Sequence, residues 1–282
     1  MFESISRSFG IVKKSFGVLM QEKKLMLFPL VSTIALIAVL VSFIVPAVFI
    51  QDDVLFFMLL FGFYFVSYFV ITFFNSALIH AANEKLEGRA VSLMASVSFA
   101  SSKVANIAVW SLISATVGII MSMLRSISNR NNGGIGALIA GLVASVMGMA
   151  WSFATFFVVP VMIFENVDPL TAIKRSVDLI KKSWGEQVIG GLMVGGVFMI
   201  LYVIGVVLVV GGILSPPLLL VLVTAGIMLM FLTFIAQGAI EGIFLAELYR
   251  YSTTGQAAIF KEEIEQAKAA APQKDPVQPP LQ

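Results

Sequence analysis

The sequence predicts an all-α membrane protein, a bundle of six transmembrane helices, and two observations carry this prediction. The first is composition: 59% of the 282 residues are hydrophobic and only 12% are charged. Soluble domains have roughly 45–50% apolar and about 25% charged residues. The second is a series of apolar runs that reach about 20 residues, the length a helix needs to cross the hydrocarbon core. The alternation typical of a β-barrel is absent, so the runs are predicted to be helices.

The predicted spans cover residues 25–50, 54–81, 104–124, 135–164, 188–213 and 218–248. The fourth and sixth runs are longer than a bilayer requires, which predicts tilt or continuation beyond the membrane. Pro46 and Pro160 are expected to kink their spans. We therefore assign residues 1–252 to one integral membrane domain. The polar segment 253–282 becomes rich in Pro and Gln and is predicted to be a largely disordered tail.

The distribution of basic residues predicts the orientation. All but two of the 18 Lys and Arg residues lie in the leader, in the connections after the second and fourth spans, or in the tail. The exceptions, Arg125 and Arg130, lie in a connection on the other side. Cytoplasmic connections are enriched in Lys and Arg. We therefore expect a multi-pass protein of the cell membrane with both termini in the cytoplasm.

A polar segment with helical periodicity precedes each outgoing span, at residues 4–22, 91–103 and 169–185. These are predicted to be amphipathic helices in the membrane interface. The first and third also match in sequence: in residues 7–15 and 175–183, Arg-Ser is followed four residues later by Lys-Lys-Ser. We infer three parallel repeats of an interfacial helix and a transmembrane hairpin. The alternative is that unrelated interfacial helices have converged on one pattern.

Short motifs carry a resemblance to known families. Residues 169–176, Pro-Leu-Thr-Ala-Ile-Lys-Arg-Ser, are followed by Trp184 and preceded by Glu165. This segment resembles a signature in the membrane domain of glycerophosphodiester phosphodiesterases. The whole chain, including residues 24–29 and 249–251, more closely resembles an uncharacterised family of prokaryotic six-span integral membrane proteins. The resemblance implies a fold and a membrane location. It implies no phosphodiesterase activity, because the chain has no soluble stretch long enough for the catalytic barrel.

Ionisable residues within spans are energetically expensive and are therefore candidates for function. Glu241 lies roughly 12 Å from the inner end of the sixth span at 1.5 Å per residue. Asn75, His80 and Glu165 also lie in the inner halves of their spans. If the four converge, they would form a polar site for a cation, a proton or a headgroup amine. The alternative is that they are interfacial, cap helices or bond neighbouring helices.

The basic faces of the predicted interfacial helices are a second candidate site. Residues placed to contact anionic lipid are Arg7, Lys13, Lys14, Arg175, Lys181 and Lys182. Each gains about 1 kcal/mol beside an anionic leaflet. The alternative is ordinary anchoring of cytoplasmic segments by positive charge.

The sequence favours a non-enzymatic role. Glycine-rich phosphate loops, metal-ligand sets and catalytic triads are absent, and the chain has one histidine and no cysteine, so we expect no catalytic residues, metal or cofactor. The favoured function is lipid binding or membrane scaffolding at the cytoplasmic leaflet, and the alternative is a small transporter or channel around Glu241. A lipid-modifying enzyme is the least favoured hypothesis. Candidate partners are membrane lipids, anionic ones included, a second copy or another membrane protein; a net charge of +2 does not indicate nucleic acid.

Overall fold

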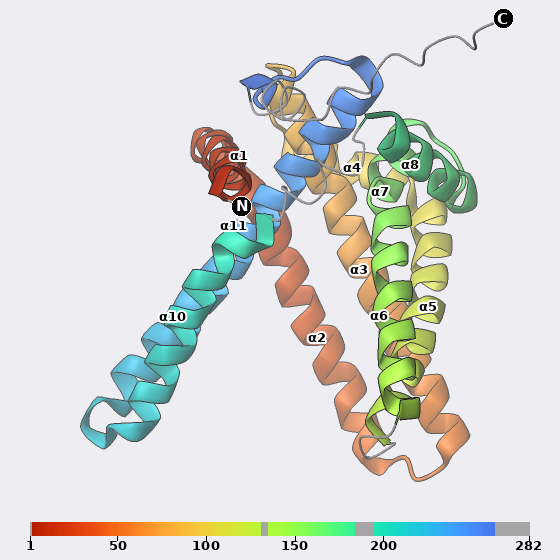
Figure 1. Cartoon of the computed structure of the whole chain (residues 1–282), viewed down its shortest axis with the longest axis vertical. Coiled ribbons are helices and arrows are strands. Elements are labelled where there is room, and N and C mark those ends of the chain that lie inside the picture. The colour runs from red at the N-terminus through yellow and green to blue at the C-terminus, as the bar shows by residue number, and fades with distance from the viewer. Residues whose placement is uncertain (1, 131–134, 184–193, 263–282) are drawn as a thin grey trace, which may run out of the picture.

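The computed structural model describes residues 2–130, 135–183 and 194–262, and within them every regular element is a helix. Figure 1 shows an inverted V whose two limbs meet at one end, which we call the cap. The short helices of the cap are α1 (Phe2–Gln21), α4 (Leu93–Ser102), α7 (Val158–Phe164) and α8 (Pro169–Ser183). The long helices are α2 (Leu27–Phe49), α3 (Asp53–Leu86), α5 (Val104–Arg130), α6 (Ile135–Thr155), α10 (Val194–Leu214) and α11 (Leu219–Thr254).

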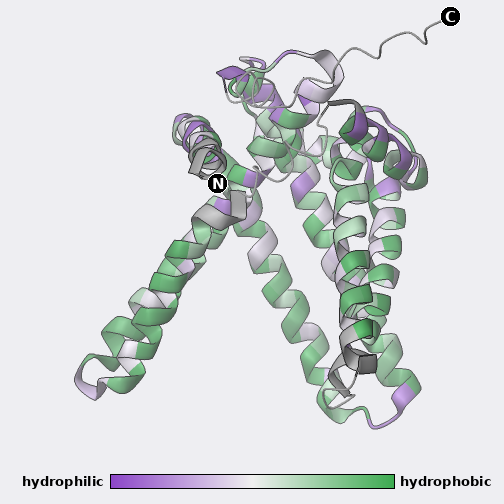
Figure 2. Ribbon diagram, viewed as in Figure 1, coloured by the Kyte–Doolittle hydropathy of each residue, from purple (hydrophilic) through white to green (hydrophobic). Residues whose placement is uncertain are grey.

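One limb contains α2, α3, α5 and α6, and the other is the α10–α11 hairpin (Figure 1). Figure 2 shows apolar residues along both limbs, while hydrophilic residues gather in the cap. Five segments are long and apolar enough to cross a membrane: Lys23–Phe49, Asp53–Leu86, Val104–Ser126, Gly141–Phe164 and Pro216–Thr254. The predicted all-helical, multi-pass architecture is confirmed in these five segments.

The predicted span 188–213 corresponds to α10. Its first residues, 188–193, lie outside the described part of the chain, and its described apolar part is the shorter segment Phe198–Leu214. A sixth span therefore stays a prediction. The tail beyond residue 262 and Trp184 of the family motif also lie outside the described residues.

Two helices are longer than the runs that predicted them. α3 has 34 residues and α11 has 36, which correspond to about 51 and 54 Å at 1.5 Å per residue. The hydrocarbon core is about 30 Å thick. Both helices therefore extend roughly 20 Å beyond it, and their polar final turns, which hydropathy excludes from a span, form part of the cap.

The predicted fourth span, 135–164, is two helices rather than one. α6 ends at Thr155, α7 begins at Val158, and the chain turns at 156–157. Pro160 lies in the first turn of α7, where a missing N–H leaves no helical bond unmade. The chain therefore breaks one turn before this proline instead of kinking at it. Pro46, in contrast, lies inside α2.

Local capping explains where several helices begin and end. The Asp52 carboxylate accepts a hydrogen bond from Leu55 N at the start of α3, with an O···N distance of 2.9 Å. Asp168 accepts from Leu170 N and Thr171 N at the start of α8, and Pro169 is the first residue of that helix. α11 ends at Gly255, whose φ of 74° is left-handed and favours glycine.

The buried core lies in the cap rather than in the limbs. Fully buried side chains such as Leu19, Leu78 and Ile163 come from α1, the inner end of α3, and α7. At the far ends of the limbs, Val48 is 76% exposed and Leu220 is 81% exposed. In a bilayer, lipid would cover these outer surfaces, so the protein holds itself together mainly at one end.

Part of the apolar stripe of α1 and of α8 is buried against this core, while Phe16 and Leu170 are exposed. On α1, Ile11 and Leu19 are buried, and on α8 Ala172 and Leu179 are buried. Lys181 on α8 is exposed. These helices therefore use their apolar sides for packing within the protein; their position in the membrane interface stays a prediction.

Candidate functional site

Glu241 lies in a short chain of hydrogen bonds that connects α10 and α11. Tyr202 of α10 donates its hydroxyl hydrogen to Oε1 of Gln237 at 2.9 Å, and Nε2 of Gln237 donates to Oε1 of Glu241 at 2.7 Å. Gln237 and Glu241 are one turn apart on α11, so helical spacing brings them together. The Glu241 side chain is exposed at the surface of the protein.

His80 has a different set of neighbours. Its Nδ1 lies 3.2 Å from Ser96 Oγ, and its ring stacks on Phe99 with centroids 4.1 Å apart. Both partners belong to α4, so His80 connects the inner end of α3 to that helix through these contacts. This is the structural role that the sequence left as the alternative.

Glu165 joins three elements of the cap. Its carboxylate forms an ion pair with Arg175 of α8, with an Oε1–Nε distance of 3.2 Å. It also accepts a hydrogen bond from the Tyr249 hydroxyl of α11 at 3.3 Å. Asn75 is exposed on α3. Glu241, His80 and Glu165 thus have separate partners, and the structure does not bring the four predicted residues into one cavity.

The Arg-Ser pair of the family motif docks α8 on the broken fourth span. Arg175 binds Glu165, and Ser176 Oγ is a buried acceptor for Phe157 N at 2.9 Å. The turn at 156–157 leaves this N–H outside the regular helical pattern, and a buried unpaired N–H is costly. At the start of the same helix, hydrogen bonds from the Thr171 hydroxyl and backbone N–H lower the pKa of Asp168.

A buried carboxylate outside the four candidate residues holds the end of the described chain. Oε1 of Glu247 accepts from Ile259 N at 2.7 Å and from Phe260 N at 3.4 Å. Glu247 is fully buried, and Phe260, 1% exposed, packs beside Phe244. Lys14 of α1 pairs with Glu262 at 2.9 Å. We call residues 255–262 the tail latch, because they connect α11 to α1.

The sequence does contain a signal for the tail latch. Gly255 ends a long helix, and an apolar pair, Ile259-Phe260, follows within one polar stretch. That pattern indicates that the chain reverses direction after the helix and that the apolar pair packs back against the protein. It does not identify Glu247 as the acceptor, since a glutamate near the inner end of a span is commonly interfacial.

The predicted lipid-contact residues divide into two groups. Lys13 and Lys181 are exposed on α1 and α8. Lys14 and Arg175 form ion pairs within the protein, with Glu262 and Glu165. The remaining two, Arg7 and Lys182, have side chains outside the described part of the structure. Among the six predicted residues, Lys13 and Lys181 are therefore the exposed ones for which no ion pair is described.

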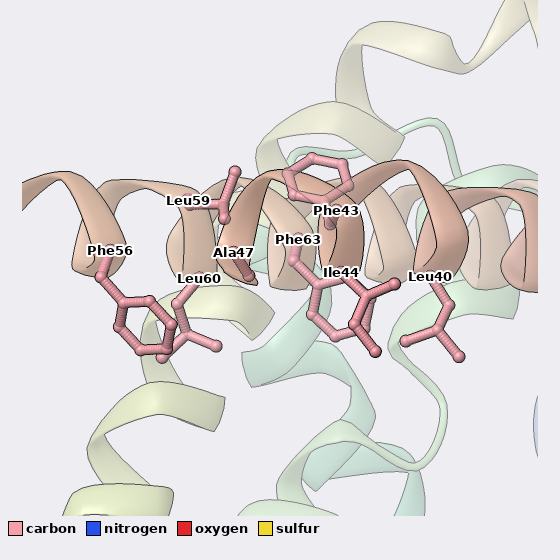
Figure 3. A pocket seen from close by; sticks show the side chains of 8 residues that line it. All are labelled: Leu40, Phe43, Ile44, Ala47, Phe56, Leu59, Leu60 and Phe63. Carbon is pink, nitrogen blue, oxygen red and sulfur yellow. The ribbon is translucent and has the colours of Figure 1, made fainter. Parts of the chain in front are cut away.

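Two grooves lie between the long helices. The larger has a volume of about 480 Å³ and lies between α2, α3 and α11, with Leu40, Tyr68 and Phe234 among its lining residues. The smaller, of about 140 Å³, separates α2 from the outer half of α3. Figure 3 shows its apolar lining of Leu40, Phe43, Ile44, Ala47, Phe56, Leu59, Leu60 and Phe63. No group of acidic and histidine side chains among the described residues could hold a metal ion.

The fold and these sites define a multi-pass helical membrane protein with a packed polar cap and lipid-exposed limbs. The chain belongs to DUF6159, a family of unknown function whose pattern matches residues 54–259. No curated protein and no solved structure shows significant similarity to it. The match includes α8 with its Arg175-Ser176 pair; the resemblance to the phosphodiesterase membrane domain stays a prediction.

Proposed function

We propose that this protein is a non-enzymatic membrane protein that binds anionic lipid at the leaflet next to its cap. The supporting observation is that α1 and α8 pack residues such as Leu19 and Leu179 into the core while Lys13 and Lys181 remain exposed. An exposed lysine at headgroup level gains about 1 kcal/mol from an anionic leaflet. A rigidly packed helix holds such charges in place, which favours a defined lipid-binding surface.

The proposal includes six spans with both termini in the cytoplasm. α10 completes the set of six as the fifth span in chain order, and α1, α4 and α8 each introduce one of three repeated hairpins. The chain order supports this, because each short cap helix is followed by two long helices or, in the middle unit, by α5 and the broken pair α6–α7. The lopsided distribution of Lys and Arg supports a cytoplasmic cap.

The test uses the full chain reconstituted in nanodiscs that contain equal amounts of phosphatidylglycerol and phosphatidylcholine. Native mass spectrometry measures which lipid stays bound. In the double variant Lys13→Glu/Lys181→Glu, we expect the preference for phosphatidylglycerol to fall at least about fivefold. Added salt should weaken the wild-type preference, because salt screens exposed charges.

A matched control changes the same kind of charge at the other end of the molecule. Arg125 is exposed near the far end of α5, and Arg125→Glu should leave the preference at the cap unchanged. An unchanged preference in the Lys13→Glu/Lys181→Glu variant, or an equal loss in the control, would rule out binding by these helices.

Transport is the second candidate function, and the chain Tyr202–Gln237–Glu241 supports it. Glu241 combines exposure with a hydrogen-bonded partner in the inner part of α11. Cation or proton flux into proteoliposomes, abolished by Glu241→Gln at equal protein content, would establish transport and replace the lipid-binding proposal. If flux into the proteoliposomes does not exceed that into protein-free vesicles, the transport hypothesis is rejected.

A further inference from the structure

We propose that the larger groove binds one acyl chain of a phospholipid whose primary-amine headgroup pairs with Glu241. The groove lies between α2, α3 and α11 and has a volume of about 480 Å³, within the range of roughly 300–1,000 Å³ typical of small-molecule sites. This site goes beyond the proposed function. It uses none of the basic residues of α1 and α8 and selects a different headgroup.

The depth of the groove matches one leaflet. On α3 its lining extends from Phe63 to Ile71. These residues follow the outer end of the helix, Asp53, by 10 and 18 positions, or about 15 and 27 Å. The hydrocarbon core is about 30 Å thick. The groove therefore runs from near the bilayer midplane to the boundary beside the cap, the depth that an acyl chain of that leaflet occupies.

Two polar side chains lie beyond the cap-side end of the groove, where the lipid headgroup would be. Asn75 and Glu241 each lie 22 residues from the outer ends of their helices, Asp53 and Leu219, which is about 33 Å. Both side chains are exposed. Each therefore lies about one hydrocarbon thickness along its own helix from the outer end.

Helical spacing directs both residues toward the groove. Asn75 is one turn from the lining residue Ile71, and Glu241 is two turns from the lining residue Phe234. Residues four and seven apart share a helix face. Gly238 lies between Phe234 and Glu241 on that face, and a Cβ placed there would be 3.2 Å from Pro29 Cβ of α2. This face of α11 therefore points at α2.

Charge complementarity selects the headgroup. Glu241 receives a hydrogen bond from the neutral amide of Gln237, which does not balance its charge. Carboxylates at membrane depth are usually paired with a cation. A primary ammonium supplies one positive charge and three N–H donors, and the Asn75 amide can donate to the adjoining phosphate. Phosphatidylethanolamine has this combination, whereas phosphatidylglycerol lacks the cation.

Position-specific photocrosslinking tests the location of the chain. A benzophenone amino acid replaces Ile37, which lines the groove, or Ala38, which is exposed at nearly the same depth about 100° around α2. In nanodiscs of mixed lipid, we expect phosphatidylethanolamine adducts at position 37 and several-fold fewer, without headgroup preference, at position 38. Equal adducts at both positions, or a crosslink to a second copy of the chain, would refute the proposal.

Native mass spectrometry tests headgroup selection. Ser67 lines the groove, and Ser67→Trp should fill it and abolish lipid retention. Glu241→Gln should reduce the preference for phosphatidylethanolamine over phosphatidylglycerol about tenfold, as expected for one lost charge-assisted interaction. Circular dichroism and size-exclusion profiles matching the wild type establish that each variant is folded.

The proposal is overturned if Glu241→Gln keeps the wild-type preference for phosphatidylethanolamine. It is also overturned if Ser67→Trp still retains lipid. The Lys13→Glu/Lys181→Glu variant should keep this preference while losing that for phosphatidylglycerol in its own assay. Failure of the two proposals can therefore be distinguished.

Discussion

Ser176 illustrates how a single hydroxyl supports the cap. Its Oγ accepts the buried N–H of Phe157 at the break between α6 and α7. The break lets Pro160 occupy the first turn of α7, where proline is tolerated. The N–H of Phe157 at this break is bonded by Ser176 of α8. The serine of the family motif therefore has a structural explanation that involves no chemistry on a substrate.

Replacing Ser176 by alanine should destabilise the protein by about 1–3 kcal/mol, because it leaves a buried donor without a partner. Thermal unfolding in detergent, followed by circular dichroism, measures the change. Ser101 is the control: its hydroxyl bonds Val97 O on an exposed helix surface, and Ser101→Ala should change stability by less than about 0.5 kcal/mol. Equal effects of the two substitutions would contradict the assignment.

Glu247 has a comparable role in the tail latch. Glu247→Ala removes the acceptor of Ile259 N and Phe260 N, so both amides should exchange hydrogen at least about tenfold faster. Glu247→Gln keeps a carbonyl acceptor and should have a smaller effect. Hydrogen exchange with mass spectrometry measures residues 255–262 directly.

The exposed residue Glu262 supplies the control for the tail latch. Its pair with Lys14 is a surface ion pair, which contributes about 0–1 kcal/mol. Glu262→Gln should therefore change exchange at Ile259 and Phe260 only slightly. If Glu262→Gln opens the segment as much as Glu247→Ala does, the ion pair rather than the buried carboxylate holds it.

At this scale the sequence predicted which residues are unusual but not which of them meet. Glu165, His80 and Glu241 stand out because each is polar within an apolar run. The partners of His80 and Glu165 lie on other helices, and their meeting depends on helix rotation and on the break at 156–157, whereas Gln237 and Glu241 share α11. Hydropathy contains neither quantity, and for that reason the sequence left open whether these residues converge on one cavity or have separate contacts.

Among the elements, the α10–α11 hairpin depends on close contact between glycines. A Cβ on Gly226 would lie 2.6 Å from the backbone oxygen of Gly205, and one on Gly212 would lie 2.9 Å from Val223 Cγ2. Such approach is typical of membrane helices that pack through small residues. A backbone atom cannot rotate away, so any side chain at 226 must separate the helices.

Gly226→Ala should therefore destabilise the hairpin by about 1–3 kcal/mol, the usual effect of overpacking. Gly211 on α10 provides a matched control because a Cβ added there would meet no atom within 4 Å. At that position alanine should be neutral or stabilise by up to about 1 kcal/mol, since it is the better helix former. Unfolding in mixed micelles, monitored by circular dichroism, should show these opposite trends, and similar losses in both variants would contradict the close-packing account.

The long helices were predictable because hydropathy reports directly on burial in lipid. The break between α6 and α7 was not, since the apolar run continues through Phe156-Phe157 and the compensating Ser176 lies 19 residues further on. The extension of α3 was also missed, whereas continuation of the sixth run beyond the membrane was one of two alternatives predicted for α11. Their polar turns leave the bilayer but continue as helix within the cap.

For the whole molecule, the contrast between cap and limbs suggests unequal rigidity. Core side chains fix the cap. The outer end of α2 and the α10–α11 hairpin lie apart (Figure 1), and both expose apolar side chains. The chain has no cysteine, so spin labels can be placed without removing native residues.

Double electron–electron resonance measurements of the distances between spin labels in nanodiscs should show this contrast. Cysteines at Lys23 and Thr253, exposed positions in the cap, should give a short and narrow distribution. Cysteines at Phe49 and Leu220, exposed at the far ends of the limbs, should give a longer and broader one. Single-label samples control for contacts between copies. A narrow, short distance for the second pair would show that the limbs close in the bilayer.

The tail latch also affects the order of events during synthesis. The core of the cap includes Leu19 and Phe260, which is made 241 residues later. Chains emerge from the ribosome beginning with the N-terminus, and membrane helices can insert before they associate. Helices made early can therefore insert before α1 meets α11 and the segment that follows it. Closure of the cap around Phe260 therefore comes after the synthesis of α11, because it requires residues that follow this helix.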